Sequence, residues 1–115
     1  MIIKDIKMEN IHGKEFELEV YLNTKSVMNI ERDLKALNPK YNYYKCLHLI
    51  DEGEMSVLLI YICNSLHKRG EKRPVGIDFF DDNDIDIFKY VNELIIKLAE
   101  CLTDNKGSVE QKEGK

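Results

Sequence analysis

The sequence of 115 residues contains no long hydrophobic run. No stretch approaches the roughly 18 consecutive apolar residues that a membrane-spanning helix requires. The first residues, MIIKDIKMEN, alternate apolar and charged side chains, so they lack the continuous apolar block of a secretory signal peptide. These two absences predict a cytoplasmic protein with no membrane partner. The share of hydrophobic residues, 43%, excludes a disordered chain, and the length indicates a single domain.

Cysteine is scarce as well. The three cysteines, Cys46, Cys63 and Cys101, lie far apart in hydrophobic stretches. An odd number of cysteines without a secretory signal argues against a disulfide framework. Free cysteine behaves as a small hydrophobic residue, so we expect all three thiols to be buried.

The chain also lacks a surplus of positive charge. Its net charge is −4, whereas nucleic-acid-binding proteins usually carry a basic surplus that neutralises phosphates. We therefore expect no nucleic-acid partner. Opposite charges are nevertheless concentrated locally in two neighbouring segments. The basic loop, residues 68–73, carries Lys68, Arg69, Lys72 and Arg73, and the acidic segment, residues 78–86, carries Asp78, Asp81, Asp82, Asp84 and Asp86.

Sequence motifs of catalysis and cofactor binding are missing. There is no nucleophile elbow, phosphate-binding glycine-rich loop or dinucleotide fingerprint. Cys63 and His67 have the spacing of two metal ligands on one helix, but no third ligand follows at a recognisable spacing. The carboxylates of residues 82–86 alternate as in a calcium loop, yet Ile87 occupies the position that must be glycine. We therefore expect no enzyme activity, no metal and no cofactor.

The N-terminal residues have the period of two that is typical of strands. In residues 15–22, EFELEVYL, one parity is apolar and the other is mostly acidic. The residues before Asn10 alternate in the same way, and the turn residues of Asn10-Ile11-His12-Gly13 separate the two runs. The pattern predicts an antiparallel β-hairpin over about residues 2–22, with one face in water.

The rest of the chain has helical periodicity. Asn23 or Thr24 is expected to cap a first helix, which ends at Asn38-Pro39 because the residue before proline avoids helical torsions. The predicted helices cover about residues 24–38, 40–50, 54–67 and 83–102. The polar residues 104–115 are expected to form a disordered tail. The predicted fold is therefore α+β, a β-hairpin followed by a bundle of three to four helices in one domain, residues 1–103.

The two charged segments predict a surface for association. In one interpretation both are simply solvated, as a loop and as a helix start. In the other, the basic loop of one subunit meets the acidic segment of the next, and such heterologous contacts build rings or open spirals. The aromatic residues Phe79, Phe80, Tyr43 and Tyr44 can anchor an interface, although we expect at least half of them to be buried in the core of the single chain. The candidate association residues are Lys68, Arg69, Lys72, Arg73, Asp78, Phe79, Phe80, Asp81, Asp82 and Asp84.

The order of these features resembles the tail assembly chaperones of long-tailed bacteriophages, the siphophages and myophages. The resemblance covers roughly residues 15–103. A strand runs into the helix start Thr24-Lys25-Ser26-Val27, which continues into Glu31-Arg32-Asp33-Leu34. The apolar helix MSVLLIYICNSLHK, the acidic segment DFFDDND and the amphipathic helix IDIFKYVNELIIKLAECL follow. Two features depart from the pattern: Asn38-Pro39 stands where many relatives have glycine, and the aromatic stretch 41–50 is long.

The resemblance implies a function in tail morphogenesis. Such a chaperone coats the aggregation-prone tape-measure protein and helps to recruit tail-tube subunits in the cytoplasm of the infected bacterium. It forms homo-oligomers and has no catalytic residues. Many relatives are also made in two lengths by a ribosomal frameshift. The final Glu113-Gly114-Lys115 is compatible with the codons GAG GGA AAA, which contain a slippery heptamer.

An alternative interpretation is a small acidic inhibitor that imitates DNA and blocks a host or rival nuclease. It is suggested by the segment from Asp78 to Asp86 and by Glu15, Glu17 and Glu19 on one strand face. A DNA mimic should be far more acidic than −4 and should not carry the basic loop.

Overall fold

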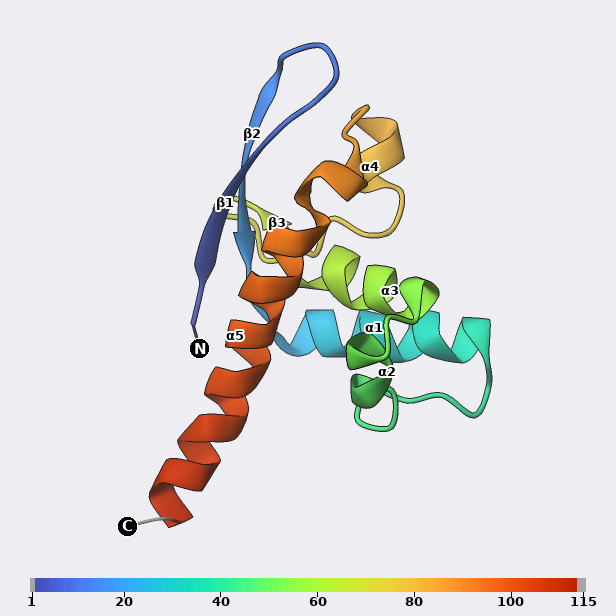
Figure 1. The fold of residues 1–115 in the computed structure, drawn as a ribbon, viewed down its shortest axis with the longest axis vertical. Coiled ribbons are helices and arrows are strands. Elements are labelled where there is room, and N and C mark those ends of the chain that lie inside the picture. Colours follow the sequence, from blue (N-terminus) through green and yellow to red (C-terminus); the bar gives the residue numbers. More distant parts are fainter. Residues whose placement is uncertain (1, 114–115) are drawn as a thin grey trace.

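A computed structural model describes the backbone of residues 2–113 and the side chains of residues 2–102. It confirms the α+β class and the N-terminal hairpin, formed by β1 (Lys4–Glu9) and β2 (Glu15–Val20) (Figure 1). The alternation predicted from the sequence puts Ile6, Met8, Leu18 and Val20 on the inner, buried face. Gly13 makes the turn with a positive φ of 85°. The Asn10 side chain accepts the N–H groups of His12 and Lys14 there.

Helix α1 (Thr24–Leu37) matches the prediction to within one residue. The side chain of Asn23 accepts the N–H of Ser26, and the hydroxyl of Ser26 accepts the N–H of Asn23. This reciprocal capping box satisfies backbone groups that the first turn leaves without a partner. Ile30 and Leu34, on the apolar side of this helix, are completely buried.

The helix predicted over residues 40–50 is wrong in its first half. Residues 43–46 form turns, and only α2 (Leu47–Asp51) is helical. Side chains form hydrogen bonds with backbone N–H and C=O groups that would otherwise have been paired within a helix. A carboxylate oxygen of Glu31 accepts the N–H of Tyr43 at 3.2 Å, and the buried hydroxyl of Tyr61 donates to the carbonyl of Tyr43. These contacts connect segments distant in sequence, which local periodicity does not reveal.

The apolar helix α3 (Met55–Ser65) ends two residues before its predicted end, because Leu66–Lys68 forms the third strand, β3. This strand pairs antiparallel with β2, which gives the sheet order β1-β2-β3. His67, which was expected in a helix, therefore lies in a strand. The correction has a physical reason: the second edge of β2 has N–H and C=O groups that need partners, and β3 supplies them.

The helix predicted over residues 83–102 begins four residues later than expected, and a short helix that was not predicted precedes it. Short helix α4 (Phe79–Asp82) is followed by a turn in which Asp84 has a φ of 56°, and α5 (Ile87–Glu113) begins after it. The backbone of α5 continues past residue 102 into the predicted polar tail, 104–115. Its side chains there, and all of Gly114 and Lys115, lie outside the described residues, so disorder of the tail and the frameshift site stay predictions.

The helices lie on one face of the sheet (Figure 1). Helix α5 runs along β1 and β2, α3 packs between α1 and α5, and α2 contacts α3. Leu94, Leu98 and Cys101 of α5 are buried against this core, as are Cys46 and Cys63. The prediction that all three cysteines are buried is confirmed. Within the described residues, no helix is both long and apolar enough to cross a bilayer.

Replacing Tyr61 by phenylalanine tests the hydrogen bond from the Tyr61 hydroxyl to the Tyr43 carbonyl, which pairs a backbone group of the non-helical residues 43–46. The substitution leaves the buried carbonyl of Tyr43 without its donor, so we expect Tyr61→Phe to lower the free energy of unfolding by about 1 to 3 kcal/mol. Urea denaturation measures this change. The matched control is Tyr44→Phe, because Tyr44 is 81% exposed. Equal stability of the two variants would contradict the assigned role of the hydroxyl.

Candidate protein-binding surface

The basic loop is a tight return of the chain after β3. His67 and Pro74 form an antiparallel bridge, and the N–H of Val75 donates to the carbonyl of Leu66 at 2.8 Å. Gly70 has a positive φ of 81° at the turn, a conformation that glycine adopts without steric cost. The chain therefore reverses direction within a few residues and returns beside the end of α3.

Side chains from the end of β2 and the start of α1 fix the backbone of this loop. The hydroxyl of Tyr21 donates to the carbonyl of Glu71 at 3.0 Å, and the amide of Asn23 donates to the carbonyl of Lys72 at 2.8 Å. Arg69 makes an ion pair with Glu17 at 3.1 Å. The loop is thus anchored along its length, while the side chains of Lys68, Arg69, Lys72 and Arg73 remain exposed.

His67 lies beneath this loop and is fully buried. Its ring stacks on the ring of Tyr21, with centroids 3.8 Å apart, and its Nδ1 lies 3.0 Å from the carbonyl oxygen of Ser65. Burial lowers the pKa of His67 from its ordinary value of 6.5, and hydrogen bonds to the backbone oppose this effect in part. Burial therefore favours the neutral form of the ring.

Ser26 and His67 resemble a nucleophile and base, because the Ser26 Oγ lies 3.4 Å from Nε2 of His67. Both residues are fully buried, and the Ser26 hydroxyl also contacts the side chain of Asn23 within the capping box. A substrate cannot reach this hydroxyl in the observed conformation. The pair therefore joins the start of α1 to β3.

The acidic segment contributes both core and surface. Phe79 and Phe80 are only 5% and 4% exposed, and the Phe79 ring packs edge-on against Phe16 at 6.0 Å. Both rings belong to the core of the single chain, the fate expected for at least half of the aromatic residues, so they offer almost no area to a partner. Asp84 turns away from the basic loop and pairs with His12 of the hairpin turn at 3.2 Å.

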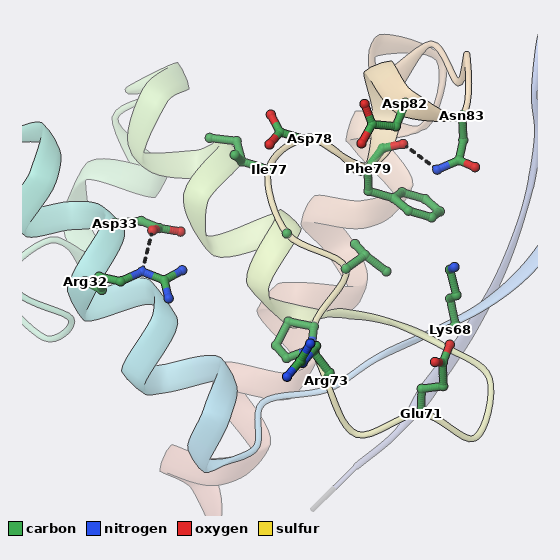
Figure 2. Close-up of a pocket in the computed structure, with 13 residues that line it drawn as sticks. Arg32, Asp33, Lys68, Glu71, Arg73, Ile77, Asp78, Phe79, Asp82 and Asn83 are labelled. Carbon is green, nitrogen blue, oxygen red and sulfur yellow. Dashed lines mark hydrogen bonds and ion pairs between the residues drawn. The ribbon is translucent and has the colours of Figure 1, made fainter.

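Half of the predicted association residues line one open depression of about 560 Å³ (Figure 2). They are Lys68, Arg73, Asp78, Phe79 and Asp82. Arg69, Lys72, Phe80, Asp81 and Asp84 are not part of its lining. The two charged segments are connected through this depression by Pro74, Val75, Gly76 and Ile77. Ile77 is 54% exposed there, so its apolar side chain lies in water next to charged ones.

The charges of the depression are not neutralised across it. Figure 2 shows Lys68 and Arg73 near one end and Asp78 and Asp82 near the other. Among the described side chains, none of these four makes an ion pair within 4.0 Å. Glu71, another lining residue, lies beside Lys68 in the view without such a pair. The surface therefore presents separated charges of both signs around exposed apolar atoms.

Helix α1 supplies two lining residues that sequence reasoning did not place in the site, Arg32 and Asp33. Their side chains pair at 3.1 Å, and Asp33 also accepts the buried amide of Asn64 at 2.9 Å. Asp33 thereby joins α1 to α3 at the rim. A sequence signal existed: Asp33 follows Ile30 by three positions, at the border of the apolar stripe, where an acid needs a polar partner.

Cys63 and His67 were the two candidate metal ligands of this region. In the described part of the chain, no group of three or more His, Cys, Asp or Glu side chains has the geometry of a metal site. Burial raises the pKa of the Cys63 thiol to about 12, so the nucleophilic thiolate is disfavoured. Cys63 lies on α3 and His67 on β3, so the two do not share a helix face.

The buried His67 should make stability depend on pH. Because its pKa is lowered in the folded state, the unfolded chain binds this proton at higher pH. The free energy of unfolding should fall as the pH drops below about 6.5, by at most about 1.4 kcal/mol per pH unit. Urea denaturation between pH 7.5 and 5 should show a shallower dependence for His67→Gln than for the wild type. His48→Gln, which alters an exposed histidine, should retain the wild-type slope; the same slope in all three proteins would contradict the assignment.

Comparison with known proteins assigns no function to the chain. No protein-family model, curated protein or solved structure matches the chain. The resemblance in the order of sequence features therefore stands as a hypothesis beside the geometry.

Proposed function

We propose that the protein is a non-catalytic, self-associating adaptor that binds other proteins through the depression between the basic loop and the acidic segment. In its specific form the proposal is a phage tail assembly chaperone, which coats the tape-measure protein and helps to recruit tail-tube subunits in the cytoplasm of the infected bacterium. The observation that carries the general proposal is the depression itself: Lys68, Arg73, Asp78 and Asp82 form no ion pair among the described side chains, and Ile77 is exposed beside them.

This combination of charge and apolar area suits a protein partner. Exposed ion pairs contribute only about 0 to 1 kcal/mol each, so the charges chiefly orient the partner and reject like-charged surfaces. The apolar atoms of Val75 and Ile77 provide area that can be removed from water on binding. A partner segment with an acid facing Arg73 and a base facing Asp78 would match both ends of the depression.

A second copy of the chain carries the same basic and acidic residues, so the basic loop of one copy can face the acidic segment of another. Where each copy uses only one of the two segments in a given contact, the contact is heterologous and leads to rings or open spirals. Self-assembly of this type would present many equivalent surfaces along a long client. The predicted partners are therefore another copy of the chain, the tape-measure protein and the tail-tube protein.

The specific form of the proposal is supported by the order of elements. A hairpin strand leads into α1, the apolar α3 precedes the basic loop, and the acidic segment precedes the long α5. This is the order on which the resemblance to tail assembly chaperones rests. Strand β3 and the short α4 were not part of that resemblance.

One observation favours the alternative, a DNA-mimic inhibitor. The outer face of the hairpin displays Asp5, Glu9, Glu15, Glu17 and Glu19. However, Lys7 and Arg69 both approach Glu17, at 4.0 and 3.1 Å, so cations interrupt the acidic row. The acidic segment lies on the other side of the sheet, since Phe79 packs on Phe16 of the inner face. The two acidic groups do not form one continuous surface, and we therefore rank the mimic second.

Charge reversal in the depression tests self-association. We expect Lys68→Glu/Arg73→Glu to reduce the mass of the oligomer in light scattering, because both ends of the depression would then be acidic. Arg69 is left unchanged, since its reversal would also break the pair with Glu17. The control is Lys40→Glu/Lys45→Glu, the same charge change on exposed residues outside the depression. Raising the salt concentration should likewise weaken the wild-type oligomer. An unchanged mass for the depression variant would exclude this surface as the interface.

The prediction that the tape-measure protein is the client is tested first by sequencing the DNA around the gene. A slippery heptamer at the last codons, followed by a second open frame and a very long helical gene, would support the tail-chaperone form. We expect co-expression with that long protein to keep it soluble, and Lys68→Glu/Arg73→Glu to reduce the soluble fraction relative to Lys40→Glu/Lys45→Glu. Aggregation of the long protein regardless of co-expression would contradict the specific form, while the general adaptor proposal would then depend on the oligomer measurement.

A further inference from the structure

Strand β1 is an edge strand whose free backbone groups can be assigned residue by residue. The N–H of Asn10 donates to the carbonyl of Lys14, which sets the phase of the ladder. The even-numbered residues of β1 therefore direct their N–H and C=O groups toward β2, and the odd-numbered residues direct theirs outward. Glu9 confirms the phase, because its outward N–H donates to the Tyr90 hydroxyl at 2.7 Å, and that hydroxyl lies 3.3 Å from the Glu9 carbonyl oxygen.

Two residues of the edge remain open. Helix α5 covers the outward groups of Glu9 through Tyr90, but within the described chain no side chain or backbone group bonds to the outward N–H and C=O of Asp5 and Lys7. Both residues are exposed, and β1 lies at the outside of the sheet in Figure 1. Unpaired edge groups of this kind are a template for another strand.

We propose that β1 pairs antiparallel with β1 of a second copy, around a two-fold axis at Ile6, so that the two three-stranded sheets join into one. The occupant is identified by charge. In this register, Asp5 of each copy lies opposite Lys7 of the other, and both residues direct their backbone groups into the new ladder. Shifting the register by two residues places Asp5 opposite Asp5 or Lys7 opposite Lys7. Opposite charges stabilise a cross-strand pair and like charges destabilise it, so the sequence selects one register.

The same register compensates an unfavourable contact within the single chain. Asp5 lies opposite Glu19 in the β1–β2 pair, an arrangement of like charges. Among the described residues, no cation pairs with Asp5. Lys7 reaches Glu17 only at 4.0 Å and is well exposed, so it can approach Asp5 of the second copy. Tyr90 limits the new ladder to Asp5 and Lys7, and the dimer should therefore be reversible and depend on concentration.

This interface is independent of the proposed function. It is isologous and uses the free edge of β1, whereas the proposed adaptor surface is the depression beside α4. The test should therefore be made in the Lys68→Glu/Arg73→Glu background, in which contact through the depression is weakened. Sedimentation velocity of the full chain over a range of concentrations should show a monomer–dimer equilibrium in this background.

Reciprocal charge exchange tests the register. We expect Asp5→Lys and Lys7→Asp, each added singly, to weaken dimerisation by roughly ten-fold or more, because each creates like-charged pairs across the axis. The double exchange Asp5→Lys/Lys7→Asp should restore the dimer. An equimolar mixture of the two single variants should form a heterodimer, because the copy with two acids then faces the copy with two lysines. Lys25→Asp, on the exposed start of α1, is the control for a change of net charge, and circular dichroism checks that each variant is folded.

Three outcomes would overturn the inference. They are a monomer at every concentration in the parent background, undiminished dimerisation of the single variants, and a mixture of single variants that stays monomeric. If the β1 variants behave as expected but Lys68→Glu/Arg73→Glu leaves the mass of the wild-type oligomer unchanged, the proposed depression interface fails while the β1 dimer stands. If instead the single β1 variants dimerise undiminished but Lys68→Glu/Arg73→Glu lowers the mass of the wild-type oligomer, the β1 dimer fails while the depression interface stands.

Discussion

The pairing of β3 with β2 is the interaction on which the other features of this protein depend. It satisfies the second edge of β2, with the N–H of Tyr21 donating to the carbonyl of Ser65. It also places His67 beneath Tyr21 and starts the tight return that carries the basic loop. Without this pairing the loop would follow α3 as a free connection, and Lys68 and Arg73 would have no fixed position relative to Asp78. A strand of three residues thus determines the geometry of the candidate surface.

Fixing the loop has a consequence for binding. A flexible loop loses conformational freedom when a partner immobilises it, and that loss reduces affinity. Here the backbone is already held by Tyr21 and Asn23, through bonds to the carbonyls of Glu71 and Lys72. Association would therefore order the exposed cationic side chains but not the chain that carries them. The buried contacts around His67 do not touch a partner, yet they stabilise the surface that would.

Sequence periodicity predicted the hairpin, α1 and most of α3 because their signals are local. Alternation located Leu18 and Val20 on the inner face, and Asn23 identified the start of α1. Strand β3 escaped prediction because three residues at the end of an apolar run have no period of their own. In the candidate site, charge clustering identified Lys68 and Asp82, whereas Arg32 depends on the packing of α1 beside the loop. The sequence could not decide whether Phe79 lies in the core or at an interface, because its core partner, Phe16, lies far away in sequence.

Asp5 and Lys7 at the edge of β1 can discourage pairing with foreign strands and favour pairing with a second copy of the chain. An apolar edge strand would pair with many extended segments, including those of an aggregation-prone client, and charged edge residues discourage such pairing. Tyr90 already closes the edge at Glu9. Asp5 and Lys7 leave an opening that an apolar strand fills poorly, because their charges would gain no partner. A strand with the reversed order of charges fills it well, and an antiparallel second copy of β1 has that order. Under the proposed chaperone function, this is specificity by rejection: the edge excludes the client and admits the chain itself.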